Sequence, residues 1–330
     1  MTDLLIDLAT AGIGGRAIEA SDEFFAPKER LVRDESPVAE PNRVTDRGRW
    51  TDGWVTRRRR EQGHEWAIVR LGLPGILRQV VVDTSHVTAD IPEGISVEAA
   101  YFEDDPHIVD LIRSRTRWSE VVTHSAISAD DRNVFAVSLG TPVTHVRLVA
   151  YPDGGIARLR CLGEPVPRPG LFDRTVEVDL AAVAHGARVI DASHRAGDPN
   201  VMLRRSDART ADDVWETPRR RGPGNDWAVV RLAGPGRLNR IVVDTSAVTG
   251  NLPAAVSVEG VEAPGISTDD LWNADWIPMV EEVEVAPNRA HAFEDLPAIE
   301  VTHLRLNVHP DGAIARFRAF GVAERGWHEE

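Results

Sequence analysis

The chain of 330 residues contains one cysteine, Cys161, so no intramolecular disulfide can form. Its 38 basic residues against 52 acidic ones give a formal net charge of −14, which argues against nucleic-acid binding, because phosphate recognition depends on a basic face. No stretch approaches the ~20 apolar residues that span a bilayer. The acidic start MTDLLIDLATAGIGG lacks the basic region and long apolar run of a signal peptide. We therefore expect a soluble, cytoplasmic protein, with neither nucleic-acid nor membrane partners, that acts on a small molecule.

One unit of sequence is present twice. Residues 54–98 and 215–259 are identical at 25 of 45 positions without a gap. A second block, VTHVRLVAYPDGGIARLRCLG at 143–163, recurs as VTHLRLNVHPDGAIARFRAFG at 301–321. A repeat of roughly 160 residues far exceeds the units of solenoids and propellers, so each copy should be a whole domain with its own core.

Length and composition agree with two domains, since 42% hydrophobic content suffices for two packed cores. The segment EPVPRPGLFD contains three prolines and is the natural linker. We place the first domain at 1–165, the linker at 166–172 and the second domain at 173–330.

The hydrophobic pattern is mostly that of β-strands. In residues 303–309 leucine and valine alternate with polar residues, and a period of two puts the apolar side chains on the core face and His303 on the outward face. The first copy alternates in the same way, which turns His145 outward. Pro-Asp-Gly turns at 152–154 and 310–312 lead into a further alternating strand, which predicts a hairpin in each copy.

Helix signals are few. The segments 106–118 and 178–189 each have the pattern of a short helix. Many short strands at close spacing with Gly and Pro turns predict an all-β fold, made of two tandem antiparallel β-sandwich domains of jelly-roll, galactose-binding-like type with few short helices.

Several long motifs, in the same order along the chain, resemble the allantoicase family. They are TDRGRWTDGW at 45–54, the arginine run that follows it, GHEWAIVRLGLPG, VDTSH, YPDGGIARLR and the N-terminal DLATAGIGGRAIEASDEFFAPKERL. The resemblance covers nearly the whole chain and includes the tandem repeat. It implies two jelly-roll domains, a homo-oligomer, and hydrolysis of allantoate, an acetate whose central carbon bears two ureido groups, to ureidoglycolate and urea in purine degradation. It supplies no agreed catalytic residues.

The reaction requires groups that hold a carboxylate, bind planar ureido groups and protonate the departing urea nitrogen. Arginine matches a carboxylate bidentately, while Asp, Asn and His supply hydrogen bonds and acid–base chemistry. The shared fold explains a residue that is kept in both copies. It does not explain a residue that is found in one copy only, so such a residue is a better candidate for the site. The first copy alone carries the loop at 20–31, Gly53, and the histidines His64 and His86.

We therefore predict the main site in the first domain. The predicted catalytic residues are His86, His64, Asp22 and Asp83, and the predicted substrate-binding residues are Lys28, Glu29, Trp50, Asp52 and Arg57. Phe24 and Phe25 would shield the site from water. Three structural readings stay open: Asp83 as a turn cap, the arginine run as a solvated strand face, and the asymmetry between the copies as the mark of a subunit interface.

No cofactor is identified from the sequence. A divalent metal ion is left open, because His64, Glu65, Asp83 and His86 are ligand types, but no spacing identifies a metal site. Cys161 lies inside an alternating strand and is expected in the core. The alternative function is a non-catalytic module that binds a small molecule or a carbohydrate through exposed aromatics, since a β-sandwich by itself does not specify function.

Overall fold

The computed structural model describes residues 5–102, 106–113, 117–166, 175–195, 197–204, 213–248, 250–265 and 268–324. The chain divides into two compact units. The first spans Leu5–Val166, and the second is formed largely by the chain after residue 166. The expected linker at 166–172 lies almost entirely outside the described residues.

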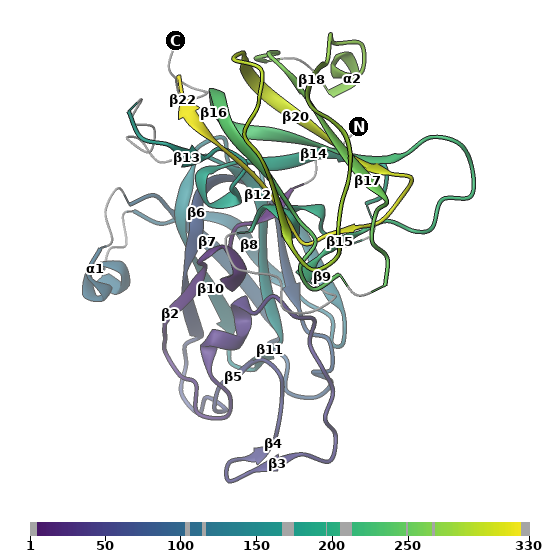
Figure 1. Ribbon diagram of the computed structural model, residues 1–330. Helices are drawn as coiled ribbons and strands as arrows, with labels where there is room; N and C mark the ends of the chain where they lie inside the picture. The colour runs from purple at the N-terminus through teal and green to yellow at the C-terminus, as the bar shows by residue number, and fades with distance from the viewer. Residues whose placement is uncertain are drawn as a thin grey trace. The chain divides into compact units, whose positions relative to one another are not determined.

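The first unit is built from short strands with one short helix. Its elements are β1 (Ile6–Asp7), η1 (Ala11–Ile13), β2 (Arg16–Ala20), η2 (Lys28–Val32), β3 (Val44–Thr45), β4 (Gly48–Arg49), β5 (Trp54–Val55), β6 (Glu65–Asp83), β7 (Gly94–Ala100), α1 (Ile108–Arg113), β8 (Ser119–Ala126), β9 (Arg132–Ala136), β10 (Val143–Tyr151), β11 (Gly155–Ile156) and β12 (Arg158–Pro165). The β3–β4 hairpin extends beyond β5 and β11 (Figure 1).

The second unit repeats this order. Its elements are β13 (Val178–Asp179), η3 (Val183–His185), β14 (Arg188–Ala192), η4 (Pro199–Leu203), β15 (Trp215–Glu216), β16 (Asp226–Asp244), β17 (Ala255–Val261), α2 (Thr268–Leu271), β18 (Ile277–Glu284), β19 (Ala290–Phe293), β20 (Glu300–His309), β21 (Ala313–Ile314) and β22 (Arg316–Ala323). The all-β fold with two tandem antiparallel sandwiches is therefore confirmed.

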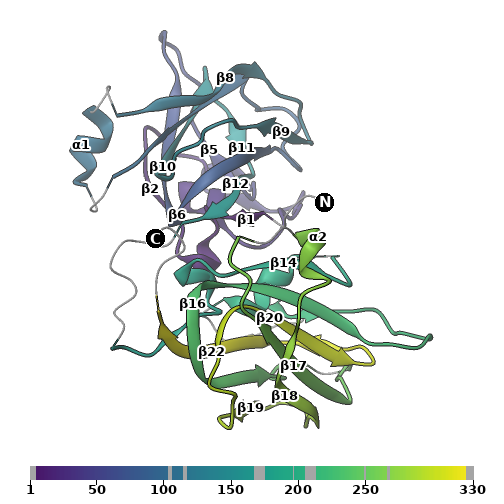
Figure 2. The same cartoon turned by 90° about the horizontal axis from the view of Figure 1, so that it is seen from above.

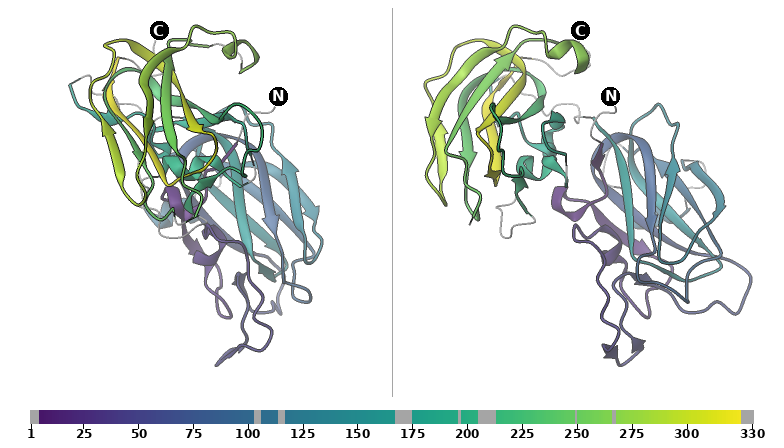
Figure 3. Two further views of the ribbon diagram at one scale, coloured as in Figure 1. Left: turned by 45° about the vertical axis from the view of Figure 1, so that its right-hand side comes forward. Right: turned by 90° about the vertical axis from the view of Figure 1, so that its right-hand side faces the viewer.

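The long strand β6 belongs to both layers of the first unit. Its first part, 65–70, pairs with β10 and β2, and its second part, 75–83, pairs with β12 and β9. The strand passes from one layer to the other at Pro74 and Gly75, where a Cβ on the glycine would lie 2.5 Å from the Leu8 side chain. One layer therefore runs β2-β6-β10-β7-β8 and the other β1-β12-β6-β9, and β16 has the same role in the second unit. Figure 3 shows the strands of each unit from two further sides.

Two sequence-based expectations about local structure are wrong. The Pro-Asp-Gly turns do not close hairpins, because β10 and β12 pair with different parts of β6, so the turn carries the chain between layers. The segment 178–189 is not a helix: it forms β13, a single 3-10 turn and the start of β14, with Gly186 in the left-handed conformation at the end of the turn. The helix expected at 106–118 is present as the shorter α1, which lies beside the sheet (Figure 2).

His145 is buried, contrary to the outward orientation expected from the alternation. Its side chain packs edge-on to Phe102 at 5.2 Å, and its Nδ1 lies 2.9 Å from the Thr144 hydroxyl. The second face of β10 is covered because Phe102 and Trp118, together with Leu111 of α1, pack onto it. His303 is buried in the same way, and burial, with the charges of two neighbouring arginines, lowers its pKa to about 3. Cys161 is in the core, as expected.

A buried ion pair ties the loop before β5 to the start of β12. Arg158 Nη2 lies 2.7 Å from Asp52 Oδ2, and the two side chains are 1% and 4% exposed. Arg158 also donates to the main-chain oxygens of Glu35 and Asp52. Burial would raise the pKa of Asp52, but the hydrogen bond and charge of Arg158 outweigh it and lower the pKa below its usual value.

Replacement of Arg158 by methionine should lower the free energy of unfolding by about 3–5 kcal/mol, because the Asp52 carboxylate would stay buried without its main partner. The matched control is Arg78→Met. Arg78 lies 2.7 Å from Glu164, the same distance, but the two side chains are 41% and 31% exposed, so we expect a change of less than about 1 kcal/mol. Urea denaturation followed by circular dichroism measures both, and equal losses would contradict the role of burial.

Candidate functional site

The polar loops of the first unit gather at one end of its two layers. Glu65, the first residue of β6, lies beside the end of β10, and Asp83, its last residue, lies beside the start of β12. A short connection joins these two strand ends, so Glu65 and Asp83 lie at the same end of the unit. The connection from β10 to β12 crosses there and pairs with β5, and Ala26 forms a β-bridge with Val55. The predicted site loop at 20–31 and the loops that follow β5 and β6 therefore share one surface.

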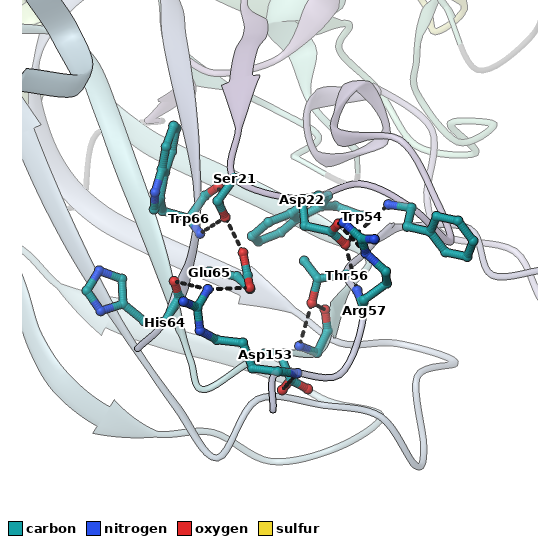
Figure 4. A network of polar contacts seen from close by, with 12 residues as sticks. Ser21, Asp22, Trp54, Thr56, Arg57, His64, Glu65, Trp66 and Asp153 are labelled. Atoms are coloured by element: carbon teal, nitrogen blue, oxygen red, sulfur yellow. Dashed lines mark hydrogen bonds and ion pairs between the residues drawn. The ribbon is translucent and has the colours of Figure 1, made fainter. Parts of the chain in front are cut away.

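Asp22 and Arg57, two predicted site residues, are in direct contact. The Asp22 carboxylate accepts hydrogen bonds from the Arg57 main-chain N–H at 2.6 Å and from its Nε at 2.8 Å, and Nη2 lies 2.7 Å away (Figure 4). The Trp54 indole fixes the loop by donating to the Asp22 carbonyl at 2.8 Å. Burial would raise the pKa of Asp22, but the hydrogen bonds from Arg57 and Phe24 outweigh it and lower the pKa. At neutral pH Asp22 is therefore an ionised group that orients Arg57.

The guanidinium of Arg57 is open to solvent on the side away from this contact. Its side chain is 65% exposed, and Asp22 engages only its Nε and Nη2. The guanidinium groups of Arg57 and Arg47 lie 5.3 and 5.1 Å from the ring centre of Phe24, which is 41% exposed. We call Asp22, Phe24, Arg47 and Arg57 the arginine anchor. Two arginines on one aromatic ring form a local basic surface that suits a carboxylate.

A second polar network lies next to the arginine anchor. Arg59 Nη1 lies 2.7 Å from Glu65, whose other oxygen accepts a hydrogen bond from the Ser21 hydroxyl at 2.5 Å. The Arg59 main-chain N–H donates to Asp153 at 2.6 Å (Figure 4). Glu65 is 7% exposed, so this network holds the loop after β5 against the start of β6.

The second unit keeps this network but lacks the arginine anchor. Arg220 pairs with Asp226 at 2.6 Å, as Arg59 pairs with Glu65 in the first unit, and the Arg220 main-chain N–H donates to Asp311 at 2.7 Å. His194 and Pro218 stand where the first unit has the aspartate and the arginine of the anchor. The shared network therefore belongs to the fold, and the anchor is specific to the first unit.

Lys28 and Glu29 are paired within their own loop. Lys28 Nζ lies 3.2 Å from Glu23 and 3.1 Å from Glu29, and its side chain is 13% exposed. Burial would lower the pKa of Lys28, but these two carboxylates outweigh it and raise the pKa. Lys28 is charged, and both of its pairs stabilise the loop that carries the anchor aspartate.

Trp50 and Asp52 contact other parts of the long loop before β5. The ring of Trp50 lies 5.2 Å from the Arg30 guanidinium and 4.6 Å from that of Arg43. Asp52 is engaged in the buried ion pair with Arg158. Among the described residues neither side chain bonds to the arginine anchor, so the contacts of both are with the scaffold of the loop.

Asp83 caps the turn after β6. Its Oδ1 accepts a hydrogen bond from the Ser85 N–H at 2.8 Å, and Asp244 makes the same contact with Ser246 at 2.7 Å in the second unit. A cap that both copies keep is explained by the shared fold. The structural reading of Asp83 thus has direct support.

His86 lies on that turn and is exposed. Its main chain is left-handed, with φ of 63°, and its N–H donates to Asp130 at 2.7 Å. Ala247, the matching residue of the second unit, has φ of 61°. The matching turn forms without a histidine, so the backbone of this turn does not require the imidazole of His86.

His64 lies at the edge of a pocket on the outer face of the sheet, away from the arginine anchor. This first-unit pocket has a volume of about 530 Å³, and its walls include His64, Trp66, Ser96, Glu98, Arg147 and Tyr151. Arg147 Nε donates to Glu98 at 2.5 Å, and the Tyr151 hydroxyl lies 3.1 Å from that of Ser96. The rings of His64 and Tyr151 are 5.3 Å apart.

The sequence reasoning missed four residues of this pocket, Ser96, Glu98, Arg147 and Tyr151. A signal was present: Ser96, Glu98 and Arg147 recur in the second copy as polar residues within strands. Because the shared fold explains residues kept in both copies, this recurrence alone does not single them out as site residues. The cross-strand register explains their meeting, since Arg147 lies opposite Glu98 in β10 and β7.

Within the described ranges, no three His, Cys, Asp or Glu side chains form a group that could hold a metal ion. His64 and His86 make no hydrogen bond or ion pair with the anchor or with each other in those ranges. None of the helices in the described parts of the chain is long and apolar enough to cross a membrane.

Comparison with known proteins gives one consistent family. A model described as the allantoicase repeat matches residues 6–166 and 178–324. The chain is 42% identical over 320 residues to a probable allantoicase of Nocardia farcinica, covering 96% of this chain and 94% of that one. It is 38% identical over 326 residues to probable allantoicase 1 of Burkholderia mallei, covering 97% and 95%. The crystal structure of an allantoicase from Saccharomyces cerevisiae superposes with a TM-score of 0.80 at 30% identity, covering 96% and 93%.

The Asp22→Asn substitution should reduce stability at neutral pH by no more than about 1 kcal/mol, because Arg57 is largely exposed. The pKa of Asp22 is lowered in the folded chain, so its contribution is complete above the unfolded pKa of ~3.9 and is lost as the pH falls through the lower folded value. The difference between wild type and variant should therefore shrink below about pH 4. Urea unfolding at several pH values measures it. Asp46→Asn, at a carboxylate that is 88% exposed, should show no such dependence.

Proposed function

Because the chain belongs to the allantoicase family, we propose that the arginine anchor of its first unit binds the carboxylate of allantoate. The activity of the chain is the hydrolysis of allantoate to ureidoglycolate and urea in purine degradation. The observation that carries the proposed site is the exposed Arg57 guanidinium, held in place by an ionised aspartate and backed by Phe24. A planar arginine fixed on one edge presents its other donors to a carboxylate with little loss of entropy.

The arginine anchor is present in the first unit and not in the second, as expected if one unit alone is active. The substrate has one carboxylate, and the second unit has a histidine and a proline in place of the two residues that hold and supply the cation. Arg47, which donates to the Phe24 carbonyl and lies 4.0 Å from the exposed Asp46 carboxylate, adds a second positive charge beside the first. On a chain with a formal charge of −14, this local basic surface favours an anionic ligand at one place.

We propose His64 and His86 as the candidates for proton transfer to the departing urea nitrogen. Both are exposed at the loop end of the first unit, and neither imidazole is taken up by an ion pair among the described residues. His86 lies on the turn after β6, whereas His64 lines the first-unit pocket, which none of the anchor residues lines. Asp22 acts as a positioning residue, and we assign the structural roles described above to Asp83, Lys28, Glu29, Trp50 and Asp52.

We further propose that the chain forms a homo-oligomer. The resemblance to the allantoicase family supports this proposal.

The direct test of the activity is urea release from allantoate by the purified chain, with and without a chelator, with allantoin as the control substrate. Urea and ureidoglycolate formed from allantoate alone is the expected result, and the chelator reports whether a metal ion contributes. An absence of turnover in every metal condition would contradict the hydrolase and favour a binding module.

Replacing Arg57 by alanine should lower kcat/KM for allantoate about tenfold to a hundredfold, mainly through KM, because a charge-assisted contact with the substrate is lost. The conservative Arg57→Lys variant should recover part of the loss, since it keeps the charge and loses the planar fork. Arg58→Ala is the control: its neighbouring side chain is also exposed, but it is not part of the anchor. Steady-state kinetics that show the same loss in both alanine variants would remove the anchor from the site.

The variants His64→Asn and His86→Ala place in the first unit the residues that the second unit has at these positions. Loss of the proton-transfer group should lower kcat about a hundredfold with little change in KM. Folding should be preserved, since Ala247 already adopts the same backbone conformation as His86. The pH profile of kcat and the thermal midpoint are the measurements. Full activity of either variant removes that histidine from the mechanism.

A further inference from the structure

The second unit has a pocket on the outer face of its sheet that the proposed reaction does not use. This second-unit pocket has a volume of about 550 Å³ and lies over β16, β20, β17 and β18, which are neighbours in the sheet (Figures 1 and 2). One wall is aromatic: the rings of Trp227 and Trp272 meet edge to face at 4.4 Å, and Trp272 is 38% exposed. Because the two rings stand at 71° to each other, a planar ligand stacks on one of them, and the exposed Trp272 is the accessible one.

The floor of the second-unit pocket is a continuous hydrogen-bonded network. Arg305 Nε donates to Glu259 at 2.6 Å, and Asn307 Nδ2 donates to the same carboxylate at 2.9 Å. Asn225 donates to the Asn307 side-chain oxygen at 3.1 Å. These groups meet because Glu259 lies opposite Arg305, and Asn307 lies opposite Trp227, in the register of the sheet.

The charges of this pocket disfavour an anion. Arg305, the single Lys or Arg among the described lining residues, is neutralised by Glu259. Two exposed carboxylates, Glu281 and Glu282, line the rim and add negative charge. An anion is therefore disfavoured. Because the Nδ2 groups of Asn225 and Asn307 are already hydrogen-bonded within the network, the pocket offers acceptors to the N–H donors of a ligand, namely the Asn225 side-chain oxygen and the rim carboxylates.

Comparison with the first-unit pocket narrows the ligand further. Both pockets contain a tryptophan, a serine and a Glu–Arg ion pair, and in both the arginine lies 4.8 Å from a second tryptophan ring, Trp118 or Trp276. The two units differ in the anion-binding anchor, which only the first has. The second-unit pocket thus keeps an aromatic and hydrogen-bonding lining without an anion-binding anchor, and such a lining suits a neutral ureido group.

We propose that the second-unit pocket binds a neutral ureide, an uncharged molecule with a planar urea-type group, at a site separate from the arginine anchor. The ureido plane lies against the exposed ring of Trp272, and its N–H groups donate to the Asn225 side-chain oxygen and to the carboxylates of Glu281 and Glu282. The choice of ligand class rests on the proposed function. Because no arginine is available for a carboxylate, this site holds a ureide without hydrolysing allantoate.

The test is calorimetric titration of the full chain with allantoin, an uncharged cyclic ureide, in the wild type and in Trp272→Ala. Trp272 is exposed, so its removal leaves the core intact, and we expect allantoin affinity to fall at least about tenfold with the loss of the aromatic wall. Allantoate hydrolysis should stay within about twofold of wild type, since the anchor is untouched. Tyr101→Ala, at an aromatic residue of the first unit that is 44% exposed, is the matched control and should leave binding unchanged.

A second variant, Asn225→His, places the first-unit residue in the second-unit pocket and should also weaken allantoin binding. Allantoin affinity that is unchanged in both variants overturns the proposal, as does binding of methyl β-D-glucoside in place of allantoin. The proposed function fails separately: if allantoate yields no urea while Trp272→Ala still abolishes allantoin binding, the ureide site stands and the hydrolase assignment falls.

Discussion

Each unit depends on one strand that serves two layers. Because β6 pairs with β10 in one layer and with β12 in the other, its two ends return to the same edge of the sandwich, and every loop that carries a candidate residue is brought there. The strand bends at Pro74 and Gly75 to reach both layers. Glycine is needed at the bend, because a side chain there would collide with Leu8. The site is thus a consequence of how the core closes.

Charge is handled differently in the scaffold and at the surface. Behind the loops, arginines are matched to carboxylates in contacts that both units keep, such as Arg59 with Glu65, so these charges are satisfied within the fold. Arg57 is held on one edge only and remains largely exposed. The two arginines therefore differ in exposure, 30% for the side chain of Arg59 and 65% for that of Arg57, and not in the number of donors that the protein occupies.

Much of this architecture could be read from the sequence, because the repeat and the alternation of apolar residues report directly on a buried sheet face. The contact between Asp22 and Arg57 was also within reach, through their absence from the second copy. The pairing of the strands could not be predicted, because the turn at 152–154 has the same residues whether it joins neighbouring strands or crosses between layers. The burial of His145 depends on a distant segment that covers it, and no local pattern reports such a cover.

Pro218 limits how the second copy could acquire the anchor contact by mutation. In the first unit the main-chain N–H of Arg57 is one of the donors that hold the anchor aspartate, and proline has no such N–H. A change of His194 back to aspartate would thus find neither the side-chain nor the backbone donor, and a change of Pro218 alone would place an arginine beside a histidine. Each single change would therefore restore only part of the contact, so an anchor of this kind in the second unit requires changes at both positions.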